Sequence, residues 1–175
     1  MTCKPNLFFH GLHLSDSAGP LDTITYYWQV SRVGSTEILV QKNGASLSSF
    51  SLIPKDNGVY RESLKVSDED AGITQIQCTI DVENAVPDVT ITAPVAETVV
   101  SVNRPIVFAG AFSNAGVRDT HTATWPFHRA GSDEVEDVPA TIEESGEHGT
   151  ARITKTFSTP GLYSFKLSVT DNDHG

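Results

Sequence analysis

Residues 22–28 read Asp-Thr-Ile-Thr-Tyr-Tyr-Trp, and residues 119–125 read Asp-Thr-His-Thr-Ala-Thr-Trp. The two stretches share an Asp-Thr pair and a tryptophan, and they lie 97 residues apart (125 − 28). From Ile24 to Val30, apolar side chains occupy every second position. A period of two places alternate side chains on opposite faces of a β-strand. We therefore expect two equivalent strands, each with a tryptophan on its inward face.

The same alternation recurs along the rest of the chain. It runs through residues 76–82 and again through residues 163–169. Turn-forming sequences fall between such runs, namely Asn43-Gly44, Asp56-Asn57-Gly58 and Pro160-Gly161. No window sustains an apolar period of 3.6 residues, which is the pattern of an amphipathic helix. Short strands at this spacing predict an all-β chain of the β-sandwich type.

The chain repeats itself on both sides of the tryptophan strands. Before them, Phe9 and Gly11 align with Phe108 and Gly110. At the offset of 97, Gly19, Asp22, Thr23 and Trp28 align with Gly116, Asp119, Thr120 and Trp125. At an offset of 103 (163 − 60), Gly58, Tyr60, Leu64, Val66, Asp68, Asp70 and Gly72 align with Gly161, Tyr163, Leu167, Val169, Asp171, Asp173 and Gly175. The offset changes only between blocks, where loops differ in length, so we interpret the pattern as a duplication.

The repeat predicts two β-sandwich domains, residues 1–85 and residues 86–175. Residues 83–87 form a short linker, whose proline ends strand pairing and stiffens the junction. A last strand over 73–82 has no counterpart in the second domain, and an opening strand at 89–91 has none in the first. We therefore expect the chain to be cut from a longer array, with unpaired sheet edges where those strands are missing.

Composition narrows the function classes. Hydrophobic residues make up 38% of the 175 residues and charged residues 19%, which is typical of a folded globular protein. The net charge of −10 repels phosphate backbones and argues against nucleic acid as a partner. No apolar run approaches the roughly 18–20 residues of a membrane helix. Residues 1–14 are too short and interrupted in their apolar run for a signal peptide, so for a secreted protein the export signal would lie outside this sequence.

The repeated motifs, taken in their order, resemble the PKD domain family of immunoglobulin-like β-sandwich repeats. They are a Phe-x-Gly, a Gly-x-x-Asp-Thr leading to a strand tryptophan, a Gly-x-Tyr after a turn, and a strand ending in Asp-x-Asp-x-Gly. The stretch 119–125 is most similar to bacterial and archaeal members. The acidic Gly-Asp-Gly turn that commonly follows the family's tryptophan is absent from residues 29–34 and 126–131. No role of that turn is therefore carried over.

The resemblance implies a non-catalytic, extracellular module at the cell surface or in a secreted protein. Its partners would be neighbouring repeats, other surface proteins or polysaccharide, and it would not insert into a membrane. A structural or adhesive spacer is the first hypothesis. The alternative is an accessory carbohydrate- or matrix-binding module of a secreted hydrolase, which a row of exposed aromatic side chains would favour. Fold alone does not decide between the two.

Several aromatic residues are predicted to form the cores. We expect Trp28 and Trp125 to anchor the space between the sheets, each contributing a few kcal/mol through burial. Tyr60 and Tyr163 are expected to be core residues whose hydroxyl groups bind a nearby loop. Glu62 occupies the inward position that aligns with Phe165. Because an unpaired buried carboxylate is costly, we expect Glu62 near a strand end with its carboxylate in water.

Two acidic turns are candidate calcium sites. Asp68 and Asp70 in one turn, and Asp171 and Asp173 in the other, alternate with other residues and can direct hard oxygens toward one ion. At the junction, further oxygens are available from Glu83, Asn84 and Asp88. The alternative is that these side chains only form Asx turns between strands. Both interpretations remain open at the level of sequence.

The sequence contains no recognisable catalytic motif. His121 follows Asp119 closely, but no serine or cysteine in an elbow motif accompanies the pair. The histidines lack the spacing of a metal site. Cys3 and Cys78 are the two cysteines, and their spacing alone does not establish whether they form a disulfide.

Overall fold

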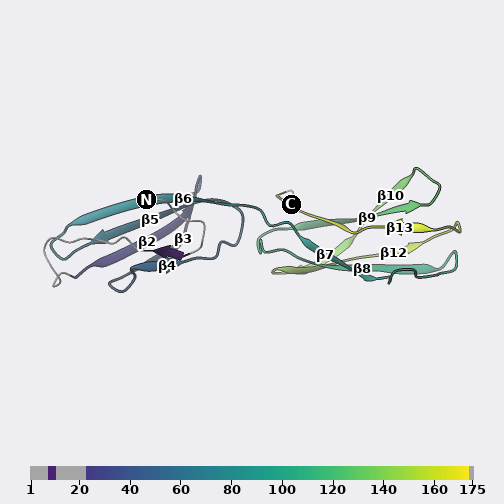
Figure 1. Ribbon diagram of the computed structural model, residues 1–175, viewed down its shortest axis with the longest axis horizontal. Helices are drawn as coiled ribbons and strands as arrows, with labels where there is room; N and C mark the ends of the chain where they lie inside the picture. The colour runs from purple at the N-terminus through teal and green to yellow at the C-terminus, as the bar shows by residue number, and fades with distance from the viewer. Residues whose placement is uncertain (1–7, 11–22, 174–175) are drawn as a thin grey trace. The chain divides into compact units, whose positions relative to one another are not determined.

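The computed structural model describes residues 8–10 and 23–173 of the chain. The residues named above that lie outside these ranges are Cys3, Gly11, Gly19, Asp22 and Gly175. The described residues form fourteen β-strands, and none of them belongs to a helix that could cross a membrane (Figure 1). Contacts within the chain divide it into two compact units, Met1–Glu83 and Asn84–Gly175. The expected all-β class is confirmed.

The first unit is built around one four-stranded antiparallel sheet. Its strands are β1 (Phe8–His10), β2 (Thr25–Arg32), β3 (Ile38–Gly44), β4 (Ser49–Ser51), β5 (Gly58–Ser67) and β6 (Ile73–Val82). The sheet has the order β3-β2-β5-β6, and β1 pairs with β4 in a separate two-stranded ladder. Phe50 of β4 packs against Trp28 of β2, with ring centroids 6.0 Å apart. The short ladder therefore covers the inward face of the sheet.

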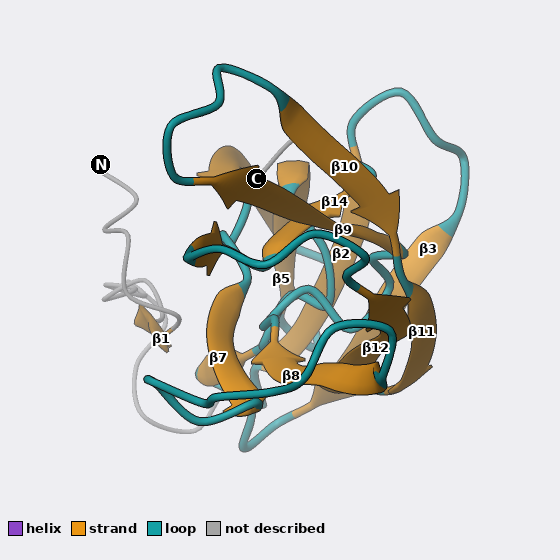
Figure 2. Cartoon of the chain, turned by 90° about the vertical axis from the view of Figure 1, so that its right-hand side faces the viewer, coloured by secondary structure: helices purple, strands orange, loops and turns teal. Residues whose placement is uncertain are grey.

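The second unit contains two four-stranded antiparallel sheets. Its strands are β7 (Asp88–Ala93), β8 (Pro105–Ser113), β9 (His121–Arg129), β10 (Val135–Pro139), β11 (Thr141–Ser145), β12 (His148–Thr156), β13 (Tyr163–Phe165) and β14 (Ser168–Asp171). One sheet has the order β11-β12-β8-β7, and in the other β9 lies between β10 and the pair β13 and β14. In Figure 2, β9 and β10 lie above β8, β11 and β12. This is a β-sandwich arrangement.

The two units pair their tryptophan strands in the same register. In the first unit Val30 of β2 lies opposite Glu62 of β5. In the second, Phe127 of β9 lies opposite Phe165 of β13. These are the same positions under the sequence offsets of 97 and 103. The equivalence deduced from the sequence therefore holds in the strand pairing, residue by residue.

Each unit has its own apolar core. Trp28 and Val30 lie at the centre of the first core with Leu64, and they are 3%, 2% and 3% exposed. In the second, Phe108 of one sheet packs against Trp125 and Phe127 of the other. The predicted role of both tryptophans as core anchors is confirmed, because Trp125 is fully buried.

The polar ends of three core aromatics are tied to nearby loops, whereas Nε1 of Trp125 is buried without a hydrogen-bond partner among the described residues. Nε1 of Trp28 donates to the carbonyl of Leu47 at 2.7 Å. The hydroxyl of Tyr60 donates to the carbonyl of Asp56 at 2.6 Å, and Tyr163 bonds the carbonyl of Thr159 in the same way at 2.9 Å. In both tyrosines the acceptor lies four residues upstream. This confirms the expected tie between each tyrosine hydroxyl and its loop.

A proline in β9 interrupts the strand that pairs with β9. Pro126 lies in the middle of β9, where it has no N–H to donate. Lys166 N donates to the Pro126 carbonyl at 3.3 Å, but the reciprocal bond is impossible. The partner strand therefore divides into β13 and β14 at this point. At the equivalent pair of the first unit, Gln29 and Ser63, the ladder continues without a break.

The glycine of the Phe-x-Gly motif in the second unit permits close packing of the two sheets. A Cβ atom at Gly110 of β8 would overlap the side chain of Leu167 and lie 3.0 Å from the carbonyl oxygen of Thr90.

We expect Gly110→Ala to destabilise the second unit by about 1–3 kcal/mol, because the added methyl group must displace Leu167. Urea unfolding measures the change. Val107→Ala, at a position of β8 that is 43% exposed, is the control and should change stability by less than about 0.5 kcal/mol. Equal stability of both variants would contradict this explanation.

Candidate functional site

Glu62 lies in the core of the first unit, so the expectation that its carboxylate would be in water near a strand end was wrong. It occupies the middle of β5, opposite Val30 of β2 and Cys78 of β6. Only 5% of the residue is exposed. Strands β2 and β6 both pair with β5 along nearly its whole length, so this inward position is enclosed from both sides.

The carboxyl group of Glu62 has few polar neighbours. Its Oε2 lies 3.3 Å from Sγ of Cys78, and its Oε1 has no hydrogen-bond partner among the described residues. Because Cys78 is disulfide-bonded, its sulfur has no proton to donate. Burial raises the pKa of Glu62 from 4.5 to about 7, since the charged form loses its hydration. Burial therefore favours the protonated form of the Glu62 carboxyl group. Only this form has a proton that it can donate to the sulfur of Cys78.

The first predicted calcium turn is closed by its own side chain. Oδ1 of Asp68 accepts from the backbone N–H of Gly72 at 2.6 Å, and Asp68 N donates to the Gly72 carbonyl at 3.2 Å. A Cβ at Gly72 would collide with the Asp68 carboxylate, so the turn needs glycine there. Asp70 is exposed. The geometry of Asp68 is that of a side chain that replaces a backbone turn bond.

The second predicted calcium turn is also closed by hydrogen bonds. Oδ1 of Asp171 accepts from the backbone N–H of Asp173 at 2.9 Å. Oδ1 of Asn172 accepts from the backbone N–H of Thr120 at 2.8 Å. The turn therefore connects the end of β14 to the residue that precedes β9. Each of these bonds uses one lone pair of its oxygen atom to hold the turn closed.

Asp171 is also the centre of a buried polar network in the second unit. Its Oδ2 accepts from Nδ2 of Asn84 at 2.9 Å and from Nδ2 of Asn114 at 3.3 Å. Asp171 and Asn114 are each 4% exposed. Hydrogen bonds to a charged group contribute about 1.5–3 kcal/mol each, and leaving the buried carboxylate unpaired would be costly. The network therefore holds Asn84, at the beginning of the unit, against the body of the sandwich.

A histidine and a glutamate extend this network. Nε2 of His121 lies 3.2 Å from Nδ2 of Asn114, and its Nδ1 lies 2.8 Å from Oε2 of Glu144. A carboxylate and an imidazole at this distance can exchange protons. However, the side chain of His121 is 4% exposed and its ring packs on Phe112, with centroids 4.8 Å apart. This packing restricts the access of a substrate to the ring.

Sequence reasoning missed the pairing of His121 with Glu144. Asp119 was the nearest carboxylate in sequence, but the partner comes from β11, on the other sheet. The sequence holds no signal for a contact between residues 23 apart on different sheets. Only the packing of the sandwich brings the two side chains together.

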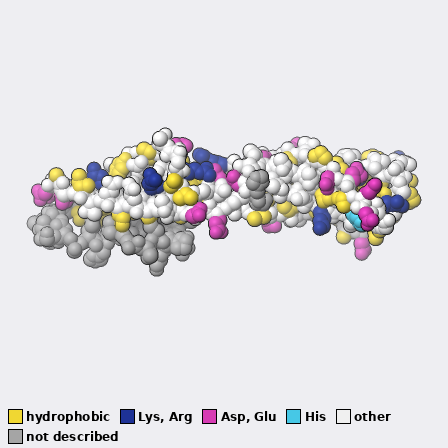
Figure 3. Space-filling model, turned by 90° about the horizontal axis from the view of Figure 1, so that it is seen from above, with side chains coloured by type: hydrophobic (Ala, Val, Ile, Leu, Met, Phe, Trp, Pro, Cys, Tyr) yellow, Lys and Arg dark blue, Asp and Glu magenta, His cyan; other side chains and the backbone are white. Residues whose placement is uncertain are grey.

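The structure brings only some of the predicted metal-binding residues together. In the second unit it joins Asn84 to Asp171 and Asp171 to Asp173. Glu83 and Asp88 are exposed, and neither makes a side-chain hydrogen bond or ion pair within the described part of the chain. Asp and Glu side chains occur at several separate places on the face shown in Figure 3.

No protein-family model matches the sequence, and no curated protein matches it. Inferences about function therefore rest on the geometry described above and on the resemblance of the repeated motifs.

The buried carboxyl group predicts a pH dependence for the first unit. Below about pH 4.5, Glu62 is protonated in the folded and the unfolded chain, and it imposes no penalty. As the pH rises from about 4.5 to about 7, only the unfolded chain ionises readily, so the folded state loses stability. Above about pH 7 the loss is complete, at about 3 kcal/mol for this pKa difference. The Glu62→Gln variant has no titrating group at this position. We therefore expect its free energy of unfolding, relative to that of the native chain, to rise by about 3 kcal/mol between pH 4 and pH 8.

Urea unfolding followed by NMR signals of the first unit separates this effect from changes in the second. Glu37→Gln, at an exposed position, is the matched control and should follow the native pH profile. Glu62→Phe, which copies Phe165 of the second unit, should also remove the dependence. Parallel profiles for Glu62→Gln and the native chain would show that Glu62 is hydrated in the folded state.

Proposed function

We propose that this chain is a non-catalytic structural module, consisting of two PKD-like, immunoglobulin-type repeats that act as a spacer in a larger cell-surface or secreted protein. The observation that carries the proposal is the short, anchored linker between the repeats. A spacer must transmit position from one end to the other, so it needs stable units and little freedom between them.

The linker leaves few residues free to bend. Strand β6 ends at Val82 and β7 begins at Asp88. Between them, Asn84 donates its side-chain amide to the buried Asp171, and Pro87 is itself buried. Proline also restricts the backbone of its own residue and of the residue before it. These contacts support limited motion at the junction.

The motif residues support the assignment to PKD-like repeats. The strand tryptophan fills each core, the tyrosine after the turn bonds its loop, and Gly110 permits the close approach of two sheets. The same residue types at the same registers in both units are typical of a repeated structural domain. We therefore propose that these motif residues stabilise the fold and take part in no reaction.

The cysteine chemistry supports an oxidising compartment. Cys78 is disulfide-bonded, while Cys3, the other cysteine of the chain, lies outside the described residues. Disulfides form and persist mainly outside the cytosol. An extracellular or cell-surface location is therefore part of the proposal.

The alternative of a carbohydrate- or matrix-binding module receives less support. Such modules present aromatic side chains in a row at the surface, where sugar rings stack. Both tryptophans are buried here, at 3% and 0% exposure, and they fill the cores. They do not provide a stacking platform.

The spacer proposal predicts that the two units tumble together. Residual dipolar couplings of the native chain should fit one alignment tensor for both units. The double variant Asn84→Gly and Pro87→Gly should require two tensors, because it removes the bond to Asp171 and the restricted proline backbone. Asn103→Gly is the control, since Asn103 already has a positive φ of 59° that glycine adopts freely. Two independent tensors in the native chain would refute a stiff spacer.

The carboxylates of Asp68 and Asp171 already accept backbone and amide hydrogen bonds, and we propose that they stabilise the acidic turns without a bound ion. We therefore expect the thermal unfolding midpoint to be the same in calcium, in magnesium and with a chelator. A ligand that binds only the native state raises the midpoint. A rise in calcium alone would show that the turns hold an ion, and Asp68→Ala and Asp173→Ala would then identify which turn binds it.

A further inference from the structure

A disulfide sulfur and a buried carboxyl group meet in the core of the first unit. Sγ of Cys78, on β6, lies 3.3 Å from Oε2 of Glu62, on β5. The two residues lie directly opposite each other in the ladder that joins these strands. Glu62 is 5% exposed, and Cys78 is half-buried. The contact between the oxygen and the sulfur is therefore fixed by the register of two paired strands.

The carboxyl group of Glu62 has no charged partner in the core. Its Oε1 has no hydrogen-bond partner among the described residues. The other titratable side chains on the same face of β2, β3 and β5 are Tyr26, Arg32, Lys42 and Tyr60. Arg32 and Tyr60 both bind Asp56, at 2.8 Å and 2.6 Å. Nζ of Lys42 lies over the ring of Phe50, 5.7 Å from its centroid. The sulfur of Cys78 is therefore the polarisable group that the carboxyl group faces.

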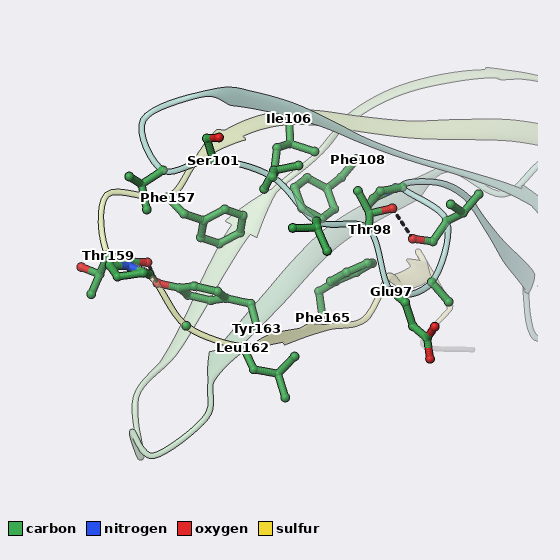
Figure 4. A pocket seen from close by; sticks show the side chains of 18 residues that line it. Glu97, Thr98, Ser101, Ile106, Phe108, Phe157, Thr159, Leu162, Tyr163 and Phe165 are labelled. Atoms are coloured by element: carbon green, nitrogen blue, oxygen red, sulfur yellow. Dashed lines mark hydrogen bonds between the residues drawn. The ribbon is translucent and has the colours of Figure 1, made fainter.

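The second unit has neither a carboxyl group at this position nor a cysteine. Phe165 takes the place of Glu62, and its ring centroid lies 4.9 Å from that of Phe108. Figure 4 shows these two rings among the apolar side chains that line a groove of the second unit. Both cysteines of the sequence belong to the first unit. The inward carboxyl group therefore occurs in the repeat that contains the disulfide, and an apolar ring replaces it in the other.

We propose that the disulfide of Cys78 is a reducible bond, and that Glu62 donates a proton to the sulfur of Cys78 when a dithiol reductant opens it. In thiol–disulfide exchange, the rate depends on how readily the departing sulfur accepts the electron pair of the broken bond. A proton donor in contact with the departing atom lowers this barrier. The carboxyl group of Glu62, 3.3 Å from the sulfur, occupies the position that such a donor needs.

Reduction then proceeds by two exchange steps. In the first, a thiolate of the reductant attacks the sulfur that is bonded to Cys78 and forms a mixed disulfide with it. The electron pair of the broken S–S bond goes to Sγ of Cys78, which takes the proton of Glu62 and leaves as a thiol. In the second, the other thiol of the reductant displaces the partner cysteine as a thiol. The reductant is oxidised to a cyclic disulfide, the protein disulfide is reduced by two electrons, and Glu62 remains as a carboxylate until water returns its proton.

The protonation state of Glu62 controls this route. Burial raises the pKa of Glu62 to about 7, so the carboxyl group keeps its proton in weakly acidic solution. Above about pH 7 the group is a carboxylate, which has no proton to give. A carboxylate also repels the negative charge that develops on the departing sulfur. The assistance from Glu62 is therefore present below about pH 7 and lost above it.

The test is the rate at which dithiothreitol reduces the disulfide in the complete native chain and in Glu62→Gln, from about pH 5.5 to about pH 9. Free thiols are alkylated at intervals and counted by mass spectrometry. The ratio of the native rate to the variant rate at each pH cancels the ionisation of the reductant, which is the same for both proteins. We expect a ratio of at least about ten at the lowest pH, falling to one or below at the highest. Glu37→Gln, at an exposed position, is the matched control, and its ratio should stay at one.

Reduction through the unfolded chain would give the opposite pH dependence. Ionisation of Glu62 destabilises the folded native chain but not Glu62→Gln, so the ratio would then rise with pH, by up to about two orders of magnitude. A ratio that rises with pH, or one that does not change, overturns the proposal. Glu62→Phe, which also lacks the proton, should show the same fall as Glu62→Gln, and it takes the place of that variant if Glu62→Gln does not fold.

Discussion

The pairing of the tryptophan strand with the tyrosine strand is the constraint on which the rest of each unit depends. It opposes Val30 to Glu62 in the first unit and Phe127 to Phe165 in the second. Because side chains alternate with a period of two, a slip of one residue would move every core side chain to the outer face. With the register held, Trp28 and Trp125 face inward, and each tyrosine lies where its hydroxyl reaches the carbonyl four residues upstream. The loops and the second layer of strands then pack against this pair.

One equivalent position shows how the two copies have diverged. Phe165 contributes an aromatic ring to the second core, whereas Glu62 places a carboxyl group in the first, beside a disulfide sulfur. The pairing of β2 with β5 places the Glu62 carboxyl group inside the core, because the same pairing that buries Trp28 also buries Glu62. The raised pKa of Glu62 follows from this conflict between strand pairing and hydration. The first unit thus retains a titratable group where the second has only apolar packing.

Polar side chains in this protein chiefly organise the backbone. Asp68 closes a turn, and Asp171 closes another while it holds Asn84 and Asn114. His121 and Glu144 continue that network between the two sheets of the second unit. This use of charge suits the proposed spacer, because each bond restricts a loop or the linker.

The sequence was sufficient to predict the all-β class, the two core tryptophans, the tyrosine contacts and the equivalence of the duplicated residues. These depend on a period of two and on spacing along the chain, which are properties of local sequence. The burial of Glu62 and the contact between His121 and Glu144 could be seen only in the tertiary structure. Each depends on which strands become neighbours and how completely they cover one another.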